Sequence, residues 1–578
     1  MDAEILSEFE RSSFSFGGEE TLSKCARLAD VYGLNAVELS ENFEVFAIQR
    51  DLKTNVISET LLGHFSAYLQ KVNGKENEKN EVIPHWRDHG QSTNVEQFDF
   101  SFLDEGTFSA PKQRSLEQAS TSNANSSLTS PGETFLHREQ RGQVVFVLNE
   151  QIPEESAFVM DSDDNQLEIK HVGKSLSCEQ KFMSNTIEDK VRAIESRIVD
   201  FVDRLKKETG IEATEPVSIQ TQDPVWVAGR ICCDAEGRLN QESILLEGSL
   251  QYSGGSRVKL DVSRMADFSL FPGQVVVVNG LNPTGGKLMA LGIIGHLPRP
   301  FRTVEQGTLR KVKILAAGGP FTTTEDFSYS PLKEFVEACK RESPDVVLLV
   351  GPFVDAEHPK IASLDVTFDK LYKDQIRPLL EELQASCPTV MVIPSTRDAH
   401  CFPVFPQPPF LSVPDGVSSI PNPCSFVVGG CLFGTSSQDV VKHMSMGVSE
   451  KLVNPGNSDR ISRLWQHVLG QGSFYPLYPP PLGTCLDTSH SHCLDFANTP
   501  DVVFIPSDLA PSAKIVSLPT PKTGVDGALS IRLSERTAIC VNPGRLAKGQ
   551  GGGTYASVVI VGSTGDIRER CKIKITRI

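Results

Sequence analysis

The segment from Ala538 to Val561 places the strongest constraint on the fold, because two apolar, strand-like runs flank a turn and a glycine cluster. The turn is Asn542-Pro543-Gly544-Arg545, and the glycine cluster extends from Gly549 to Gly553. Glycine adopts backbone conformations that other residues avoid, so these glycines favour a tight backbone path between strands. We expect the segment to form a terminal β-hairpin.

Upstream of this segment, apolar strands alternate with helical segments. Strand-like runs occur at 312–320, 345–352, 389–394, 425–428, 431–435 and 502–506, and helical patterns at 332–341 and 371–384. The runs are almost continuously apolar, as in strands that are buried on both faces. We therefore predict that residues 301–578 form a layered α/β domain.

Residues 217–300 show a different pattern, in which five short strand-like runs are separated by turn residues. This pattern predicts a small β-barrel of the OB type. An amphipathic helix is expected at 186–208, within a segment (186–216) that leads into the barrel.

OB barrels often bind single-stranded nucleic acid through exposed aromatic and basic side chains. The aromatic candidates here are Trp226, Tyr252 and Phe268, but few lysines or arginines lie between them. The pattern favours a structural or protein-binding barrel, and a nucleic-acid platform stays open as an alternative.

The N-terminal part of the chain combines a helical pattern with a polar segment. Residues 1–72 contain apolar residues at helical spacing, most regularly from Leu22 to Tyr32, and predict a small helical docking module. Residues 73–185 are largely polar, and we expect them to form a disordered linker. Ser130, which precedes a proline in this linker, is a candidate site for a proline-directed kinase.

The composition argues against several classes of protein. The formal net charge of −17 does not fit a surface that binds DNA by neutralising phosphates, although a local basic patch is compatible with it. No run of about 18 apolar residues is present, so no membrane span is expected. The 13 cysteines have irregular spacings, which favours reduced thiols in the nucleus or cytosol over a disulfide framework.

The strand order is similar to that of binuclear metallophosphoesterases, in which loops after the strands supply Asp, His and Asn ligands to two metal ions. After the first strand this chain has Gly319-Pro320 instead of the usual Asp-x-His motif. After the second strand it has Gly351-Pro352, with Pro352 at the usual Asp position. The first two loops therefore lack their expected ligands.

The later loops are also altered. Thr396 and Arg397 replace the amide and imidazole ligands after the third strand, and Ser507 and Asp508 stand where a histidine motif would occur. An arginine brings a fixed positive charge, which opposes metal binding. Three residues of suitable type remain, and because they do not complete a two-metal site we expect no metal, no cofactor and no catalytic residue; they are Asp355, Asp398 and His400.

Three further groups of residues are candidates for metal binding, phosphate contact or partner contact. A set with metal-ligand side chains, whose spacing matches no common zinc module, consists of Cys485, His490, His492 and Cys493. A basic segment, interpreted as a solvated face or a phosphate contact, contains Arg299, Arg302, Arg310, Lys311 and Lys313. A proline-rich stretch at 474–481, a candidate for packing or partner contact, carries Tyr475 and Tyr478.

A family resemblance is carried by LLVGPFVDAEHP (348–359), VIPSTRDAH (392–400), YPLYPPP (475–481), VVFIPSDL (502–509) and CVNPGRLAKGQGGGTY (540–555). With the order of helical module, linker, barrel and phosphoesterase-like domain, these motifs resemble the B subunits of DNA polymerase alpha-primase. The resemblance covers the chain from about residue 186 onward. Its terminal motif residues include Asn542, Pro543, Gly544, Arg545, Gly549 and Gly553.

The resemblance implies a nuclear, non-catalytic subunit with a calcineurin-like phosphoesterase sandwich that lacks metal ligands. It implies that the OB and phosphoesterase domains hold the C-terminal domain of the polymerase catalytic subunit, and that primase joins the assembly. It further implies that the N-terminal domain contacts other replication factors, that DNA contacts are mostly indirect, and that the subunit supports primer synthesis when replication begins. The alternatives are a B subunit of another replicative polymerase, an active metallophosphoesterase, or a single-strand-binding OB protein.

Overall fold

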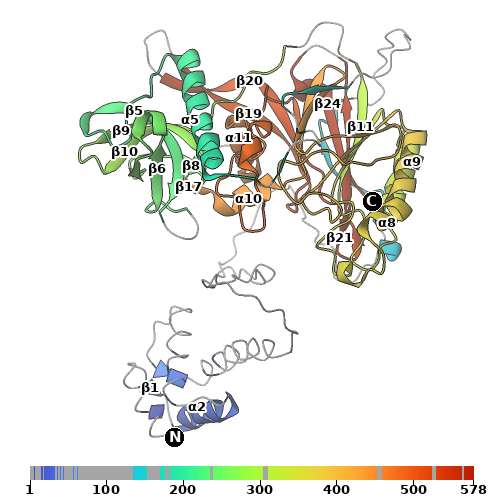
Figure 1. Cartoon of the computed structure of the whole chain (residues 1–578), viewed down its shortest axis with the longest axis horizontal. Helices are drawn as coiled ribbons and strands as arrows, with labels where there is room; N and C mark the ends of the chain where they lie inside the picture. The colour runs from blue at the N-terminus through green and yellow to red at the C-terminus, as the bar shows by residue number, and fades with distance from the viewer. Residues whose placement is uncertain are drawn as a thin grey trace, which may run out of the picture. The chain divides into compact units, whose positions relative to one another are not determined.

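The computed structural model (Figure 1) consists of two compact units that divide after Asn123. The described residues are 135–578, except 139, 153–168, 175, 177–180, 183, 235–238, 304–309, 452–458, 524–528 and 563–564. Nearer the N-terminus they are 5–6, 9, 15–16, 19–32, 36, 39–40, 43, 56–57, 62 and 65. No helix among these residues is both long and apolar enough to cross a membrane.

The N-terminal unit contains a helix and a short parallel strand pair. Helix α2 (Glu19–Tyr32) is present where the helical pattern predicts it. Strand β1 (Ser15–Phe16) pairs in parallel with β2 (Val56–Ile57). The buried apolar residues of this unit are Ile5, Phe9, Cys25, Ala26, Ala29, Leu39, Phe43, Ile57, Leu62 and Phe65.

In the larger unit, helix α5 (Ile187–Thr209) forms as the amphipathic pattern predicts. Thr186 and Asp189 form a capping box at its N-terminus, and Gly210 ends it in the left-handed conformation. The five predicted strands close into a barrel in the order β10-β7-β6-β5-β9. Their bounds are Thr221–Cys233 (β5), Ile244–Gly248 (β6), Arg257–Asp261 (β7), Val275–Asn282 (β9) and Lys287–Ile294 (β10).

The candidate stacking residues of the barrel do not form an exposed aromatic surface. Trp226 and Tyr252 are partly buried in the apolar cluster beneath α5, which packs on β5 and β9. Phe268 lies in the barrel core and is only 6% exposed. These positions favour the structural or protein-binding interpretation of the barrel over a nucleic-acid platform, because α5 partly covers Trp226 and Tyr252 and the core holds Phe268.

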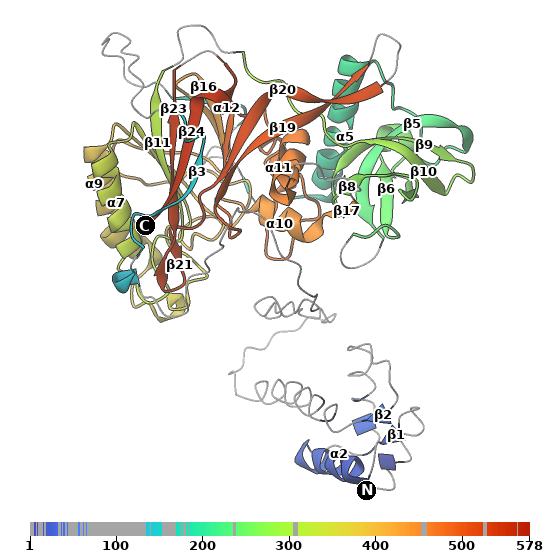
Figure 2. The ribbon, with the colours of Figure 1, turned by 180° about the vertical axis from the view of Figure 1, so that it is seen from behind.

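Two mixed sheets pack face to face in the rest of this unit (Figure 1 and Figure 2). The seven-stranded sheet has the order β14-β13-β12-β11-β23-β24-β3, and the six-stranded sheet has the order β19-β20-β18-β16-β15-β4. The first sheet comprises β3 (Val144–Leu148), β11 (Val312–Gly318), β12 (Val346–Val350), β13 (Thr389–Ile393), β14 (Val417–Ser419), β23 (Thr554–Ile560) and β24 (Cys571–Arg577). The second comprises β4 (Lys170–Val172), β15 (Cys424–Val428), β16 (Cys431–Thr435), β18 (Val502–Phe504), β19 (Ser512–Thr523) and β20 (Leu529–Asn542).

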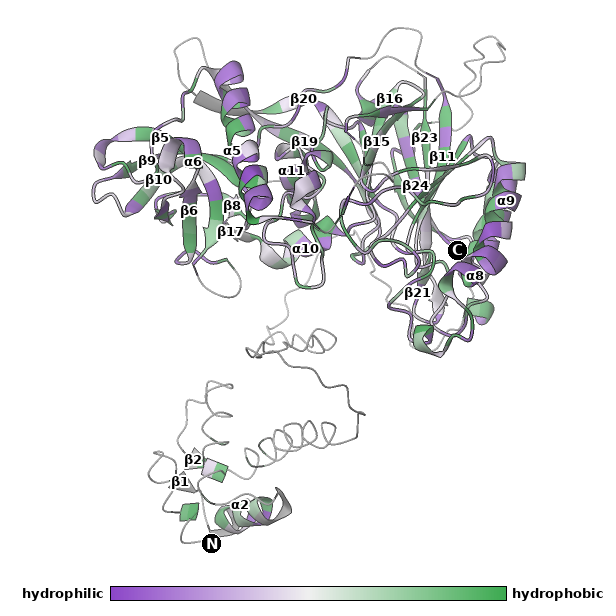
Figure 3. Cartoon of the chain, in the orientation of Figure 1, coloured by the Kyte–Doolittle hydropathy of each residue, from purple (hydrophilic) through white to green (hydrophobic). Residues whose placement is uncertain are grey.

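Apolar side chains from both sheets fill the space between them, and the strands β11, β15 and β23 are accordingly green in Figure 3. Helices α7 (Ser330–Glu342) and α9 (Arg377–Ser386) pack on the outer face of the seven-stranded sheet. Helices α10 (Val440–Gly447) and α11 (Arg460–Gly470) pack on the outer face of the six-stranded sheet. The layered α/β prediction is confirmed, with two sheets enclosed by two helical layers.

The prediction of a terminal hairpin is wrong. Strand β20 pairs with β18 and β19 in one sheet, whereas β23 pairs with β11 and β24 in the other. Residues 543–553 therefore connect the two sheets, and within them β21 (Ala547–Lys548) pairs with β22 (Gly551–Gly552). Both long strands are interior strands with neighbours on each side, so neither can pair with the other.

Part of the expected disordered linker at 73–185 is ordered. Strand β3 pairs with β24 at the edge of the seven-stranded sheet, and β4 pairs with β15 at the edge of the six-stranded sheet. The apolar residues of β3 pair with β24, so this short segment is ordered although the neighbouring residues in the sequence are polar. Ser130 lies outside the described residues.

The barrel and the two-sheet body are joined by a strand pair and by the side-chain amide of Gln471. Strand β8 (Phe268–Leu270) pairs with β17 (Ser449–Lys451), which crosses the predicted boundary between 217–300 and 301–578. The Gln471 side chain accepts a hydrogen bond from Val275 N–H (2.9 Å) and donates to Val275 O (2.9 Å) and Gly295 O (2.8 Å). This one amide is fully used in linking the end of α11 to the barrel.

Candidate functional site

The loops that follow the predicted strands meet at one edge of the sheets. Strands β11, β12 and β13 run in parallel, so the loops after them emerge at the same edge. A Cβ added to Gly319 would lie 2.2 Å from Pro352 O, and one added to Gly318 would lie 2.4 Å from the Pro506 Cβ. These glycines are required because the loops after β11, β12 and β18 pack too closely to leave room for a side chain.

Arg397 and Asp355 form a bidentate ion pair at this edge. Arg397 Nε donates to Asp355 Oδ1 at 3.0 Å, and Nη2 donates to Oδ2 at 2.5 Å. The same guanidinium lies 3.1 Å from Glu357. Bidentate pairs of this kind are among the stronger polar contacts in proteins. Both oxygens of Asp355 are therefore already occupied by a cation of the chain itself.

Asp398 links two loops through their main chains. Its Oδ1 accepts from the N–H groups of Phe353 (2.5 Å) and Val354 (3.0 Å), and its Oδ2 accepts from Ser395 N–H (2.8 Å). Burial raises the pKa of Asp398 to about 7, against the effect of these three N–H donors. The side chain is 2% exposed, so it supports the loops and does not face a ligand.

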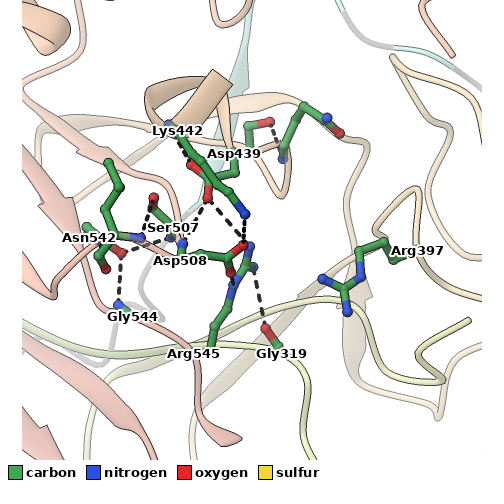
Figure 4. Close-up of polar contacts among 12 residues, drawn as sticks. Gly319, Arg397, Asp439, Lys442, Ser507, Asp508, Asn542, Gly544 and Arg545 are labelled. Atoms are coloured by element: carbon green, nitrogen blue, oxygen red, sulfur yellow. Dashed lines mark hydrogen bonds and ion pairs between the residues drawn. The ribbon is translucent and has the colours of Figure 1, made fainter. Parts of the chain in front are cut away.

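A second ionic cluster surrounds Arg545 (Figure 4). Arg545 Nε donates to Asp508 Oδ1 at 2.8 Å, and its Nη1 lies 3.4 Å from Gly319 O. Lys442 Nζ donates to the other Asp508 oxygen at 2.7 Å, and Asp439 accepts from Asp508 N–H at 2.8 Å. Burial alone would raise the pKa of Asp508, but Arg545 and Lys442 outweigh it and hold this pKa below its usual range.

Asp439 and Lys442 are members of this cluster that sequence reasoning missed. Asp439 caps the N-terminus of α10 by accepting from Lys442 N–H at 3.0 Å. An Asp before a helical segment is a visible capping signal, but nothing in the sequence shows that the capped helix end meets the loop after β18.

Asn542 organises the turn that follows β20. Its Oδ1 accepts from Ser507 N–H (2.8 Å) and Gly544 N–H (2.9 Å), and its Nδ2 donates to Leu509 O (3.0 Å). Gly544 has φ +76°, and a Cβ there would lie 2.5 Å from Thr554 Oγ1. The Asn-Pro-Gly-Arg motif is thus a structural turn that delivers Arg545 to Asp508.

The glycine cluster allows close approach of two backbones. A Cβ added to Gly553 would lie 1.9 Å from Arg545 O, so no larger residue fits there without a backbone shift. Gly549 has φ +58°, and its carbonyl accepts from Thr324 N–H at 2.9 Å. The expected tight path between strands is present, although the strands belong to different sheets.

The remaining predicted positions are divided between two surfaces. Thr396 Oγ1 donates to Gln438 Oε1 at 3.2 Å, near the ionic clusters. His400 instead stacks on Phe410, with ring centroids 5.2 Å apart and planes 9° apart, and burial lowers its pKa to about 4. The structure brings Asp355 and Asp398 together and places the His400 ring in a separate aromatic cluster.

The side chains at this edge do not fit a pair of metal ions. Within the described part of the chain, no group of three or more His, Cys, Asp or Glu side chains could hold one. Arg397 and Arg545 place fixed positive charges on the carboxylates that would otherwise bind cations. The set Cys485, His490, His492 and Cys493 is likewise not arranged to hold a metal ion. His490 Nε2 instead donates to Lys181 O at 2.8 Å.

Other residues that the sequence suggested as candidate contact residues pair or pack within the chain itself. Arg299 pairs with Asp200 at 2.9 Å, and Lys313 pairs with Glu342 at 3.0 Å. Tyr475 is 2% exposed and lies in the core beside α10 and α11, so it packs inside the chain.

Comparisons with known proteins agree with this architecture. The chain matches the family of the B subunits of DNA polymerases alpha and epsilon over residues 314–514, and the OB domain of the DNA polymerase alpha B subunit over residues 192–295. The B subunit of DNA polymerase alpha from Rattus norvegicus is 33% identical over 458 residues, which cover 77% of this chain and 73% of the relative. The protein of the same name from Schizosaccharomyces pombe is 35% identical over 369 residues, covering 59% and 60% respectively. The chain therefore belongs to the family of DNA polymerase alpha B subunits.

Proposed function

We propose that this chain is a non-catalytic accessory subunit of the nuclear DNA polymerase alpha-primase complex. Its family membership supports this role, since relatives that match most of the chain carry the subunit's name. In this role the chain holds other subunits in place and supports primer synthesis at the start of replication. The match of its barrel to the alpha OB domain favours this assignment over a B subunit of another polymerase.

The observation that carries the non-catalytic part of the proposal is the pairing of Arg397 with Asp355 and of Arg545 with Asp508. We interpret the two-sheet body as a calcineurin-like phosphoesterase sandwich whose ligand loops have become structural. Two cationic side chains neutralise the remaining carboxylates, so the edge needs no metal ion to be stable. A hydrolase of this type requires metal ions to activate water.

We assign the roles of the domains within the predicted boundaries, with two changes. The module at 1–72 contacts other replication factors, while the barrel (217–300) and the body (301–578) together hold the C-terminal domain of the catalytic subunit, with primase in the same assembly. The segment at 186–216 belongs with the barrel, because α5 packs on it. The ordered strands β3 and β4 assign 144–148 and 170–172 to the body. DNA contacts are mostly indirect.

The catalytic question is tested on the purified full-length chain. Its metal content is measured by elemental analysis, and its activity is measured on a generic phosphodiester with manganese or iron added. We expect no stoichiometric metal and no turnover. Bound manganese or iron together with turnover that is lost in Asp355→Asn would contradict the proposal.

The assembly question is tested by co-expression with the polymerase alpha catalytic subunit. We expect co-purification of the full chain and of a variant that lacks residues 1–123, because the second compact unit begins at residue 124. Co-expression with the epsilon catalytic subunit is the matched control. Equal recovery of both catalytic subunits would contradict assignment to the alpha complex.

A further inference from the structure

A groove lies between the helical segment at 368–377 and the loop at 400–412. Figure 1 labels the two helices nearest to these segments, α8 (Phe368–Leu371) and α9. Its volume is about 460 Å³, which is within the range of pockets that bind organic ligands. We call it the His400 groove and define it by Tyr372, Lys373, Arg377, His400, Phe410 and Leu411. It is separate from the ionic clusters of the candidate site.

The floor of the His400 groove is aromatic. The His400 ring lies between Phe410, whose centroid is 5.2 Å away, and Tyr372, whose centroid is 4.7 Å away. Tyr372 and Phe410 are 6% and 8% exposed, so the stack is firmly packed. Tyr372 begins a π-helical segment that ends at Ile376, and such irregular turns are frequent at functional sites.

Three polar atoms of this floor have no hydrogen-bond partner. Both ring nitrogens of His400 and the hydroxyl oxygen of Tyr372 are covered by protein and form no hydrogen bond. Buried polar groups are nearly always paired, and a neutral imidazole needs both an acceptor and a donor. The nearby side chain that can move aside without losing buried contacts is Leu411, which is 78% exposed.

The rim of the groove is apolar and basic. Besides Leu411, Phe402 is 43% exposed, although its ring stacks on Phe182. Lys373 is exposed and pairs with no carboxylate in the described part of the chain. Arg377 donates to Glu381 at 3.0 Å, and Asp369 is the acidic residue of the lining. The rim thus carries two cations and one anion on a chain whose net charge is −17.

We propose that the His400 groove binds a short peptide of a partner protein in which a large apolar side chain stands beside carboxylates. The apolar side chain fits beside Leu411 and Phe402, and the carboxylates complement Lys373 and Arg377. When Leu411 turns aside, the main-chain N–H and C=O groups of an extended peptide match the unpaired atoms of His400 and Tyr372. The proposal is independent of the role assigned above, since it concerns a different surface.

A peptide is favoured over a single-stranded nucleic acid by the same contacts. The aromatic rings of the floor are covered and cannot stack on bases as an open platform would. Only two basic residues, Lys373 and Arg377, face the groove, and this number matches the two carboxylates of a short peptide. Sustained binding of a nucleic-acid backbone requires several cationic contacts.

The test uses the purified full-length chain and a fluorescent peptide with blocked termini and the sequence Asp-Phe-Asp-Leu. Its anisotropy reports binding, and a peptide with lysine at both acidic positions is the control probe. We expect the acidic peptide to bind with a dissociation constant of about 10 to 100 μM. Leu411→Asp and Lys373→Glu should each weaken binding about tenfold.

Two further variants separate docking from general surface effects. Leu482→Asp is the matched control, because Leu482 is 74% exposed but is not part of the groove. His400→Phe keeps a ring in the stack and removes the unpaired nitrogens, so it should weaken peptide binding without lowering the melting temperature. The proposal is overturned if no binding is seen up to roughly 1 mM, if Leu411→Asp and Leu482→Asp bind equally, or if the lysine peptide binds as well. An oligothymidine probe that binds and is lost in Lys373→Glu would overturn it in favour of nucleic acid.

Discussion

The guanidinium of Arg397 binds both carboxylate oxygens of Asp355, a side chain that is only 7% exposed. A carboxylate that is this buried is unfavourable unless its charge is compensated. In an active binuclear site the compensating charge would come from metal ions, whereas here it comes from a residue of the next loop. The pair therefore joins the loops after β12 and β13.

Replacement of Arg397 should destabilise the chain substantially. Arg397→Ala leaves Asp355 buried without a partner, and removal of one member of a buried pair costs about 3 kcal/mol. Because Arg397 itself is 30% exposed, solvent reduces this cost, and we expect about 2 kcal/mol in the free energy of unfolding. Urea denaturation at neutral pH measures it.

Lys206→Ala is a control for this loss, because Lys206 and Glu212 form an ion pair in which both side chains are more than half exposed. Solvent screens such an exposed pair, so its removal should change the stability little. Arg397→Lys should recover only part of the loss, since an ammonium cannot bind both oxygens in the planar geometry of arginine. Equal stabilities of Arg397→Ala and Lys206→Ala would contradict the interpretation.

Gly553→Ala tests the close approach of the connection between the sheets. The added Cβ would lie 1.9 Å from Arg545 O and 2.9 Å from Arg545 C, which are backbone atoms that cannot turn aside. We expect a loss of about 2 to 3 kcal/mol in unfolding free energy, typical of overpacking. Gly286→Ala is the matched control, because its Cβ would meet nothing within 4 Å. Thermal unfolding of the two variants distinguishes this steric effect from a general effect of replacing glycine.

The sequence predicts those parts of the fold that depend on local periodicity. Helix α5 and the five barrel strands follow from amphipathic and short apolar patterns, and the barrel closes as expected. The gathering of Asp355 and Asp398 is also predictable, because parallel strands deliver their following loops to one edge.

The choice of strand partners is not encoded in such local patterns. The apolar runs of β20 and β23 look alike, and nothing in either run shows that they enter different sheets. Strand β3 is a clear apolar run at Val144–Leu148, but its polar surroundings conceal that β24 pairs with it. Partner choice depends on contacts between residues that are distant in the sequence.

The candidate site shows the same limit. The presence of Thr396 and Arg397 after the third strand is visible in the sequence, but the pairing of Arg397 with Asp355 requires the loop geometry. The direction of the His400 ring, toward Phe410, is likewise set by tertiary packing. No sequence motif marks Lys442 as part of the site, and its contact with Asp508 depends on how α10 packs.

The contact between the barrel and α11 should make stability depend on pH. His296 Nε2 lies 3.1 Å from His467 Nδ1, and His467 Nε2 lies 2.8 Å from Ser269 Oγ, an arrangement that suits two neutral rings. Burial lowers the pKa of His296 to about 4. Burial also lowers the pKa of His467 well below its usual value, and the nearby His296 and Arg463 add to this shift. Between pH 6.5 and 4 the unfolded chain therefore binds more protons at these residues, so stability should fall as pH decreases.

The variant His467→Gln isolates this effect. At pH 5 the wild type should lose about 2 kcal/mol more than the variant, relative to pH 7, because the variant has lost one of the two depressed histidines. Asp398, with its raised pKa, changes stability in the opposite direction over this range, but it is present in both proteins and cancels in the comparison. Urea denaturation at the two pH values gives the difference, and equal pH slopes would contradict it.

Truncation should be tolerated up to residue 123 and not up to residue 185. Removal of 1–123 takes away one compact unit as a whole. Removal of 1–185 also deletes β3 and β4 and so exposes the edges of β24 and β15, which are prone to pair with other chains. It also deletes Phe135, which is 5% exposed in the core beneath α7, a loss of about 3 kcal/mol by itself.

Thermal unfolding and size-exclusion chromatography of both truncated chains measure this difference. We expect the shorter deletion to keep the melting temperature of the larger unit, and the longer one to lower it and to form aggregates. Phe135→Ala in the shorter deletion should reproduce part of the loss without exposing a strand edge. If the two truncated chains unfold at the same temperature and remain monodisperse, β3 and β4 do not contribute to the stability of the two sheets, because the edges they cover would then be stable without them.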